Sequence, residues 1–243
     1  LQVQTLETLA KALRHVGRSE LALPLDALAQ ATRADFQRLL LPDGTLAGFA
    51  WFHEDGRVEY LAHPSDRTTG LGYSLLPMIH AIINELLTPE QAAHHAAVIR
   101  EQLLARDGAR LFDKPPVYRG GVQKIFQRAE TSTFFGREIG LMYTHAHLRF
   151  AEAMARRGDA DAFWLAIRKA VPIGLRDVVS GARLRQSNCY TSSSDPAFPD
   201  RYEAQERYRE VYDGTIPFEG GWRVYSSGAG IAFRLIHERL FGL

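Results

Sequence analysis

The sequence has 243 residues, which at about 150 residues per domain allows one large domain or two small ones. Hydrophobic residues make up 46% and charged residues 23%, a balance that excludes an intrinsically disordered chain. The formal net charge of +1 gives no overall attraction to nucleic acid or to a membrane surface, so neither is expected as a partner. The single cysteine, Cys189, excludes an internal disulfide and a cysteine-rich zinc module.

The first part of the sequence predicts two helices followed by a β-hairpin. Apolar residues recur at helical spacing at Leu6, Leu9, Leu13 and Val16. Gly17 follows them in the position of a C-cap. A second helix is expected over residues 24–40, with Pro24 in its first turn. Residues 46–53 and 58–61 flank a Glu-Asp-Gly turn and predict two antiparallel strands.

The middle of the sequence predicts a buried helix and then a capped one. Residues 73–87 are apolar around nearly the whole circumference, which is typical of a buried helix, and Pro77 is expected in its first turn or at a kink. Thr88 as N-cap, Pro89 at the first helical position and Gln91 form a capping-box pattern. A further helix is therefore expected to begin here.

The last part of the sequence predicts an αα-hairpin, a loop and two more helices. Residues 135–157 and 160–170 have helical patterns, with Gly158 and Asp159 at the turn between them. The later helices are expected over residues 201–212 and 227–241. The fold class is thus mainly α with a small β-hairpin. Long helices paired by loops fit a helical toroid such as an (α/α)6 barrel, and a simple bundle fits the same periodicity nearly as well.

Several loops are rich in aromatic, amide and guanidinium side chains, which suit a sugar site. Aromatic faces stack on pyranose rings, and planar amide or guanidinium groups bind vicinal hydroxyls. The candidates on this local chemistry are Gln127, Arg128, Asn188, Trp222 and Arg223. The alternative for each segment is a solvated turn with ordinary capping residues.

A second kind of site is indicated where small residues precede an apolar helix that is expected to begin near Gly230. Ser226, Ser227 and Gly228 lie there, and a helix N-terminus offers unpaired backbone N–H groups and the positive end of the helix dipole. Phosphate fits that chemistry. The alternative is a plain serine N-cap, which stabilises a helix by about 1 kcal/mol.

The sequence predicts no metal and no cofactor. His145 and His147 lie two apart on a helix and do not share a face, and His94 and His95 are expected on a solvated face. The sequence contains no H-E-x-x-H motif, EF-hand loop or G-x-S-x-G motif. Nucleophilic catalysis by serine or cysteine therefore has little support.

The stretches DGARLFDKPPVYRGGVQKIFQRAETSTFFGREIGLMYTHAHLRFAEAMA, LRQSNCYTSSSDPAF and GGWRVYSSGAGI resemble glycoside hydrolase family 94, with the closest likeness to its phosphorylases of 1,2-β-oligoglucans. The resemblance implies an (α/α)6 barrel and inverting phosphorolysis of β-1,2-linked glucooligosaccharides to α-glucose 1-phosphate. It implies that Ser226, Ser227 and Gly228 hold phosphate, the co-substrate. It also implies that Gln186 and Tyr190 line the sugar subsites.

The sequence departs from this family at the general acid, an Asp in a D-W-N-D or similar context. No Asp here has that context, and Asp66 is a poor substitute. We therefore expect no catalytic residue within residues 1–243, which would form a single domain and an incomplete barrel without its N-terminal helices. Such a chain should be inactive alone and should expose apolar faces. The intact protein is expected to be cytoplasmic and to be capable of forming a homodimer.

Two other interpretations stay open. The second is that the chain is part of the related phosphorylase-like C-terminal domain of a cyclic β-1,2-glucan synthase, in which transmembrane helices and a glycosyltransferase domain would lie upstream. The third interpretation is a non-catalytic helical module that binds a glycan or a protein.

Overall fold

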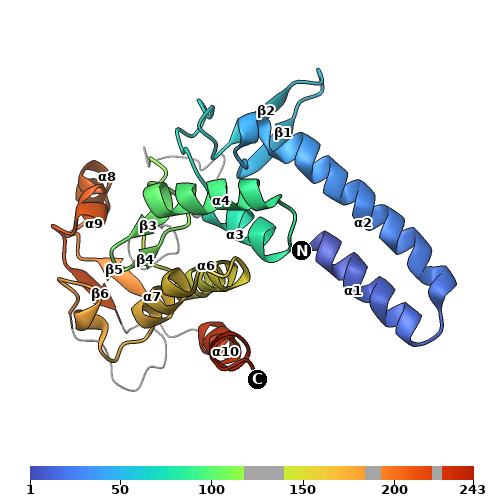
Figure 1. Cartoon of the computed structure of the whole chain (residues 1–243). Helices are drawn as coiled ribbons and strands as arrows, with labels where there is room; N and C mark the ends of the chain where they lie inside the picture. Colours follow the sequence, from blue (N-terminus) through green and yellow to red (C-terminus); the bar gives the residue numbers. More distant parts are fainter. Residues whose placement is uncertain (118–139, 184–192, 221–225) are drawn as a thin grey trace.

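The structure is a computed structural model that describes residues 1–117, 140–183, 193–220 and 226–243 (Figure 1). It is mainly helical, and the strands of the described residues form three two-stranded antiparallel sheets. The predicted class, a mainly α fold with a small hairpin that is consistent with a partial helical barrel, is confirmed.

The helices are α1 (Gln2–His15), α2 (Ser19–Leu40), α3 (Leu75–Ile83), α4 (Pro89–Val98), α6 (Thr144–Arg156), α7 (Ala160–Ala170), α8 (Arg201–Arg207), α9 (Glu210–Asp213) and α10 (Ser226–Leu235). Short helical turns are η1 (Pro42–Gly44), η2 (Ile99–Leu103), η3 (Leu175–Asp177) and η4 (Ile236–Leu240). The strands are β1 (Phe49–Phe52), β2 (Val58–Leu61), β3 (Leu104–Ala105), β4 (Gly108–Ala109), β5 (Ser194–Pro196) and β6 (Phe218–Gly220).

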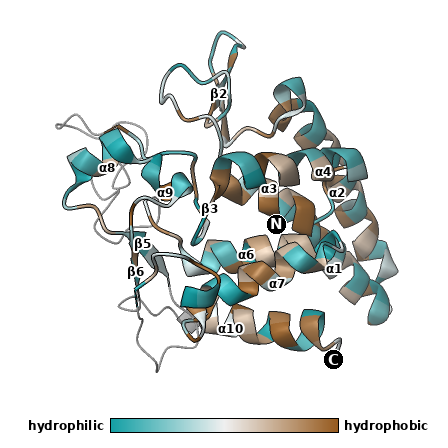
Figure 2. Ribbon diagram, turned by 60° about the vertical axis from the view of Figure 1, so that its left-hand side comes forward, coloured by the Kyte–Doolittle hydropathy of each residue, from teal (hydrophilic) through white to brown (hydrophobic). Residues whose placement is uncertain are grey.

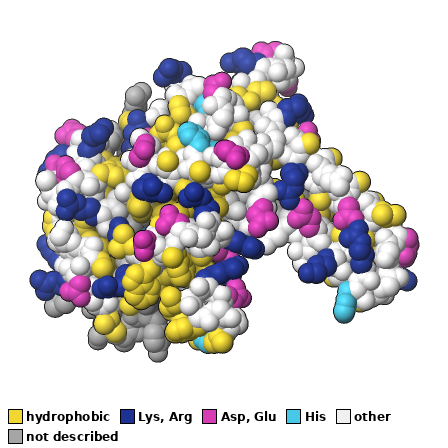
Figure 3. Space-filling model, in the orientation of Figure 1, with side chains coloured by type: hydrophobic (Ala, Val, Ile, Leu, Met, Phe, Trp, Pro, Cys, Tyr) yellow, Lys and Arg dark blue, Asp and Glu magenta, His cyan; other side chains and the backbone are white. Residues whose placement is uncertain are grey.

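Helices α1 and α2 form an antiparallel arm that projects from the rest of the molecule (Figures 1 and 3). Gly17 ends α1 with a φ of +75°, and the amide of Arg18 donates to the carbonyl of Leu13 at 2.8 Å, which confirms the predicted C-cap. The predicted start of α2 was wrong: the helix begins at Ser19, so Pro24 lies inside it. Pro24 is exposed, so water can satisfy the carbonyl that loses its amide partner.

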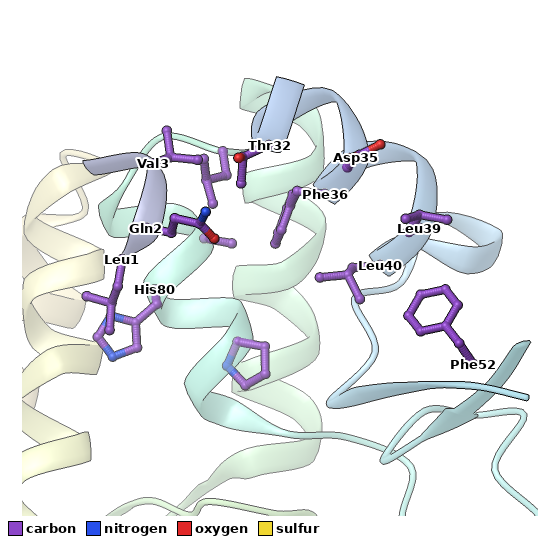
Figure 4. Close-up of a pocket in the computed structure, with 13 residues that line it drawn as sticks. Leu1, Gln2, Val3, Thr32, Asp35, Phe36, Leu39, Leu40, Phe52 and His80 are labelled. Atoms are coloured by element: carbon purple, nitrogen blue, oxygen red, sulfur yellow. The ribbon is translucent and has the colours of Figure 1, made fainter. Parts of the chain in front are cut away.

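The arm leaves apolar surface exposed. The side chains of Leu1, Leu9, Val16, Leu21, Leu23 and Leu28 are all more than 45% exposed. A groove of about 400 Å³ runs between the arm, α3 and the β1–β2 hairpin, and Phe36, Leu40 and Phe52 line it (Figure 4). This groove is apolar and is unsuited to a sugar or an anion.

The main core lies where α3, α4, α6, α7 and α10 pack together (Figure 2). Helix α3 is buried on nearly all sides, as its sequence predicts, and Pro77 lies in its first turn. The predicted capping box of α4 is present: the amide of Gln91 donates to Thr88 Oγ1 at 3.2 Å, and the amide of Thr88 donates to Gln91 Oε1 at 2.9 Å.

The predicted αα-hairpin is present as α6 and α7, but α6 begins later than expected. Asp159 caps α7 by accepting from the amide of Ala162 at 3.1 Å, and Gly158 has a φ of +74°. Residues 140–143 of the predicted helix are not helical. Met142 exchanges backbone hydrogen bonds with Ser194, and this pairing competes with helix formation. Residues 135–139 lie outside the described part of the chain.

His95 corrects another expectation, because it is buried rather than on a solvated face. Its Nε2 accepts the amide hydrogen of Leu46 at 2.9 Å, and its Nδ1 donates to the carbonyl of Gln91 at 2.7 Å. The chain that follows α2 returns over this side of α4 and covers the ring. His94 is exposed, as expected.

The ion pair of Asp107 and Arg110 is entirely buried, with nitrogen–oxygen distances of 2.9 and 3.0 Å. We expect Asp107→Ala to destabilise the fold by about 3–5 kcal/mol, because it leaves the guanidinium charge buried without its partner. Urea unfolding measures this loss. Asp35→Ala, which breaks an exposed pair with Arg38, is the control and should change the free energy of unfolding by less than about 1 kcal/mol. Equal losses in the two variants would contradict the prediction.

A second prediction concerns His147, which is completely buried with both ring nitrogens used. Nδ1 accepts the amide hydrogen of Ala109 at 3.1 Å, and Nε2 donates to the carbonyl of Ala166 at 2.8 Å. Burial is the main cause that lowers the pKa of His147 to about 4; the hydrogen bond to the Ala166 carbonyl opposes this shift, and the charge of Lys169 adds to it.

The unfolded chain therefore takes up a proton on this ring near pH 6.5, whereas the folded chain does so only near pH 4. The contribution of the neutral His147 ring to the free energy of unfolding is fully present above pH 6.5. It is lost as the pH falls to 4, and the total loss is about 3 kcal/mol. The free energy of unfolding is measured with urea at pH 7.5 and at pH 4.5. Between these two pH values, the His147→Gln variant should lose less of it than the wild type does. His94→Gln should lose as much stability between these two pH values as the wild type does. If His147→Gln also loses as much as the wild type, the lowered pKa of His147 is refuted.

Candidate functional site

Three chain segments meet at one end of the β5–β6 sheet. Strand pairing places Ser194 opposite Gly220. Ser194 also forms a bridge with Met142, whose amide donates to the Ser194 carbonyl at 2.7 Å, while the Ser194 amide donates back at 3.2 Å. Both Met142 and Ser194 are buried. The chain that follows residues 118–139, the chain that follows residues 184–192 and the chain that precedes residues 221–225 are therefore held together.

The segment before residue 184 reaches the same sheet. The amide of Arg183 donates to the carbonyl of Phe218 at 2.9 Å, and Ala182 forms a parallel bridge with Phe218. Arg183 also forms an ion pair with Glu219. Strand β6 thus has β5 on one side and residues 182–183 on the other. The chain before and the chain after residues 184–192 are therefore both paired with β6.

All of the sequence-predicted sugar residues belong to these three segments. Gln127, Arg128, Gln186, Asn188, Tyr190, Trp222 and Arg223 lie outside the described residues, and so does Cys189. Their individual roles stay predictions. What the structure establishes is that Met142, Ser194 and Gly220, each of which lies next to or within three residues of one of these segments, converge.

The predicted phosphate residues lie at the start of α10. The helix begins at Ser226 rather than near Gly230, so Ser226, Ser227 and Gly228 form its first turn instead of preceding it. The backbone N–H groups of a first turn have no partner within the helix. Gly228 is buried, and without a side chain it lets another group approach the backbone closely. A helix start of this kind suits an anion.

The first turn of α6 lies directly after the Met142–Ser194 bridge and was not recognised from the sequence as part of a site. Thr144 is buried, and within the described part of the chain its Oγ1 has no hydrogen-bond partner. The ring of His145 stacks on Tyr143 with centroids 6.0 Å apart. Burial and Arg149 lower the pKa of His145, so that the neutral ring is favoured at pH 7. In the sequence, His145 stands out only as a possible metal ligand beside His147, and no local pattern marks it as part of this site.

A buried polar cluster of Asp107, Arg110 and Tyr208 packs beneath the chain that leads into α6. The Tyr208 hydroxyl donates to the carbonyl of Gly140 at 3.4 Å, two residues before the bridge. Arg110 interacts with that phenol and with Asp107. Burial raises the pKa of Tyr208 to about 12, so the hydroxyl keeps its proton and remains a donor.

Asp66 is unsuited to the role of general acid, as the sequence analysis expects. Its carboxylate accepts the amide hydrogens of Ala62, Thr68 and Thr69, each at 2.8 Å, and the hydroxyl of Thr69. Burial opposes ionisation, but these hydrogen bonds outweigh it and lower the pKa of Asp66. A proton donor needs a raised pKa instead, so Asp66 stabilises its loop.

Within residues 1–117, 140–183, 193–220 and 226–243, no three histidine, cysteine, aspartate or glutamate side chains are grouped to hold a metal ion. None of the helices described in these ranges combines the length and apolar character needed to cross a bilayer.

Comparison with known proteins shows one clear likeness. No protein-family model matches the chain. Over 219 residues, 90% of its length, the chain is 42% identical to a 1,2-beta-oligoglucan phosphorylase of Listeria innocua serovar 6a. The chain spans 20% of that relative. The resemblance to phosphorylases of 1,2-β-oligoglucans that the sequence motifs indicate is therefore confirmed.

Proposed function

We propose that this chain is the part of an inverting glycoside phosphorylase that binds phosphate and part of the glucan, with β-1,2-linked glucooligosaccharides as substrates. The observation that carries the proposal is the convergence at Ser194, which is bonded to Met142 and paired with Gly220. The identity to a 1,2-beta-oligoglucan phosphorylase over 90% of this chain supports the reaction class.

In the proposed reaction, an oxygen of phosphate attacks the anomeric carbon of the terminal glucose. The bond from that carbon to the glycosidic oxygen breaks, and a carboxylic acid protonates the departing oxygen. The products are α-glucose 1-phosphate and a shortened oligosaccharide. A general base is unnecessary because phosphate is already a nucleophile, in contrast to the water of an inverting hydrolase.

We assign phosphate to the first turn of α10, at Ser226, Ser227 and Gly228. The free amides and the dipole of a helix N-terminus provide donors to a dianion without side-chain charges. Helix α6 packs against α10, and its own first turn carries Thr144 and His145. A buried hydroxyl and a neutral imidazole beside a second helix start would add donors to the same anion.

The glucan would be bound by the residues predicted from local chemistry and resemblance, including Gln186, Tyr190 and Trp222. We propose that the general acid is supplied from outside this chain, because Asp66 is held ionised by its hydrogen bonds. A chain lacking the acid would bind phosphate and glucan without turning them over.

The test is phosphorolysis by the full-length protein. With sophorooligosaccharides and phosphate it should release glucose 1-phosphate of α configuration, measured by proton NMR. Ser226→Ala combined with Ser227→Ala should raise the KM for phosphate about tenfold or more, because one lost charge-assisted hydrogen bond corresponds to about 1.5–3 kcal/mol.

The matched control is Ser19→Ala, which alters the exposed first residue of another helix, α2. It should leave the KM for phosphate unchanged. If no glucose 1-phosphate forms from any β-1,2-linked oligosaccharide, the proposed reaction is wrong. If the double variant keeps the wild-type KM, the phosphate assignment is wrong.

A further inference from the structure

A polar cavity of about 380 Å³ lies on the α8–α9 side of the molecule. It is enclosed by the end of η2, by the loop at Asp113 and Lys114, and by α8 and α9. Figures 1 and 2 both place α8 and α9 well apart from α10. Asp113 and Lys114 belong to the first of the stretches quoted above, and Tyr208 also contacts Gly140, but no residue of the proposed phosphate site lines this cavity.

The wall of the cavity is fixed in position by hydrogen bonds. Asp113 Oδ1 accepts the amide hydrogens of Gly72 at 3.0 Å and Tyr73 at 3.1 Å. The Tyr212 hydroxyl donates to the backbone carbonyl of Asp113 at 3.3 Å. A site whose groups are already ordered loses little entropy when a ligand binds.

The lining groups favour a neutral ligand that is rich in hydroxyls. The three carboxylates of Glu101, Asp113 and Glu206 face the two cations of Lys114 and Arg209, which leaves a net charge near −1. Burial raises the pKa of Asp113, which weakens that charge further. The balance gives no strong attraction to an anion such as phosphate or to a multivalent cation.

The remaining lining groups fit vicinal hydroxyls. The amide of Gln102 offers both a donor and an acceptor, and the carboxylates add acceptors. The rings of Tyr208 and Tyr212 lie at 75° to each other, with centroids 6.1 Å apart, and supply apolar surface. The volume falls in the range of small-ligand sites, about 300–1,000 Å³.

We infer that this cavity binds a saccharide unit at a second site, separate from the proposed phosphate site on α10. The polyol class follows from the lining groups alone. Its identification as glucose, or as the two glucose units of sophorose, rests on the proposed function. Such a site would hold part of a glucan away from the reacting end.

The test is hydrogen–deuterium exchange of the full-length protein with and without sophorose. Binding should slow the exchange of residues 201–213 severalfold, because a bound ligand suppresses the local opening of α8 and α9. Gln205→Trp fills the cavity from an exposed position and should abolish this protection. The matched control Tyr202→Trp, on the same helix but outside the cavity, should retain it.

The outcomes separate this inference from the proposed function. If phosphorolysis proceeds but residues 201–213 show no protection, or if Gln205→Trp is protected like the wild type, the second site is refuted and the phosphorylase proposal stands. If sophorose protects these residues in the wild type and not in Gln205→Trp, the site is supported, even where no glucose 1-phosphate forms. The Gln205→Trp variant should keep the wild-type rate of phosphorolysis on short oligosaccharides.

Discussion

The backbone of Ser194 connects three distant parts of the chain. It exchanges two hydrogen bonds with Met142 and pairs with Gly220 across the β5–β6 sheet. A single backbone hydrogen bond contributes only about 1 kcal/mol net, but leaving a buried donor or acceptor unpaired costs more. Because Met142 and Ser194 are both almost fully buried, separating these segments would expose or orphan several backbone groups at once. The convergence is therefore strongly specified.

The close approach at this point depends on Gly108. Its φ is +144°, and a Cβ built there would lie 2.6 Å from Met142 Cγ and 2.9 Å from His147 Nδ1. No other residue leaves room for both neighbours in this backbone conformation. Gly108 adjoins the buried pair of Asp107 and Arg110, so one short turn both carries the buried charges and admits the α6 segment. The position of the Met142 segment beside the candidate site therefore depends on this turn.

Local features of the sequence were sufficient to predict much of the fold. The capping box at Thr88 and Gln91, the turn at Gly158 and Asp159, and the C-cap at Gly17 are each decided by residues within a few positions of one another. Short-range hydrogen bonds dominate at such places. The same is true of the β1–β2 hairpin, whose strands flank a turn of five residues.

Features that depend on distant neighbours could not be predicted in this way. The helical pattern through residues 140–143 is overridden by the pairing with Ser194, some fifty positions later. His95 has the surroundings of a surface residue in sequence, yet Leu46 covers it. The cavity beside Asp113 combines four separate segments, and no single one of them indicates a cavity. The segments that hold Gln127, Gln186 and Trp222 were recognised by chemistry and resemblance, and only their borders are placed.

The electrostatics of α6 and α10 bear on how an anion would be held under the proposed function. Glu152, nearly buried, accepts from Arg149 at 2.6 Å and from Arg234 at 2.7 Å, and Arg234 also contacts Glu238 at 2.9 Å. Two cations and two anions therefore balance along the faces of these helices. Among the described residues of these two helices, these pairings leave little net side-chain charge to attract phosphate from a distance. The donors that the described residues would supply under the proposed function are short-range ones, the backbone amides and hydroxyls of the two first turns, which act on an anion seated between them.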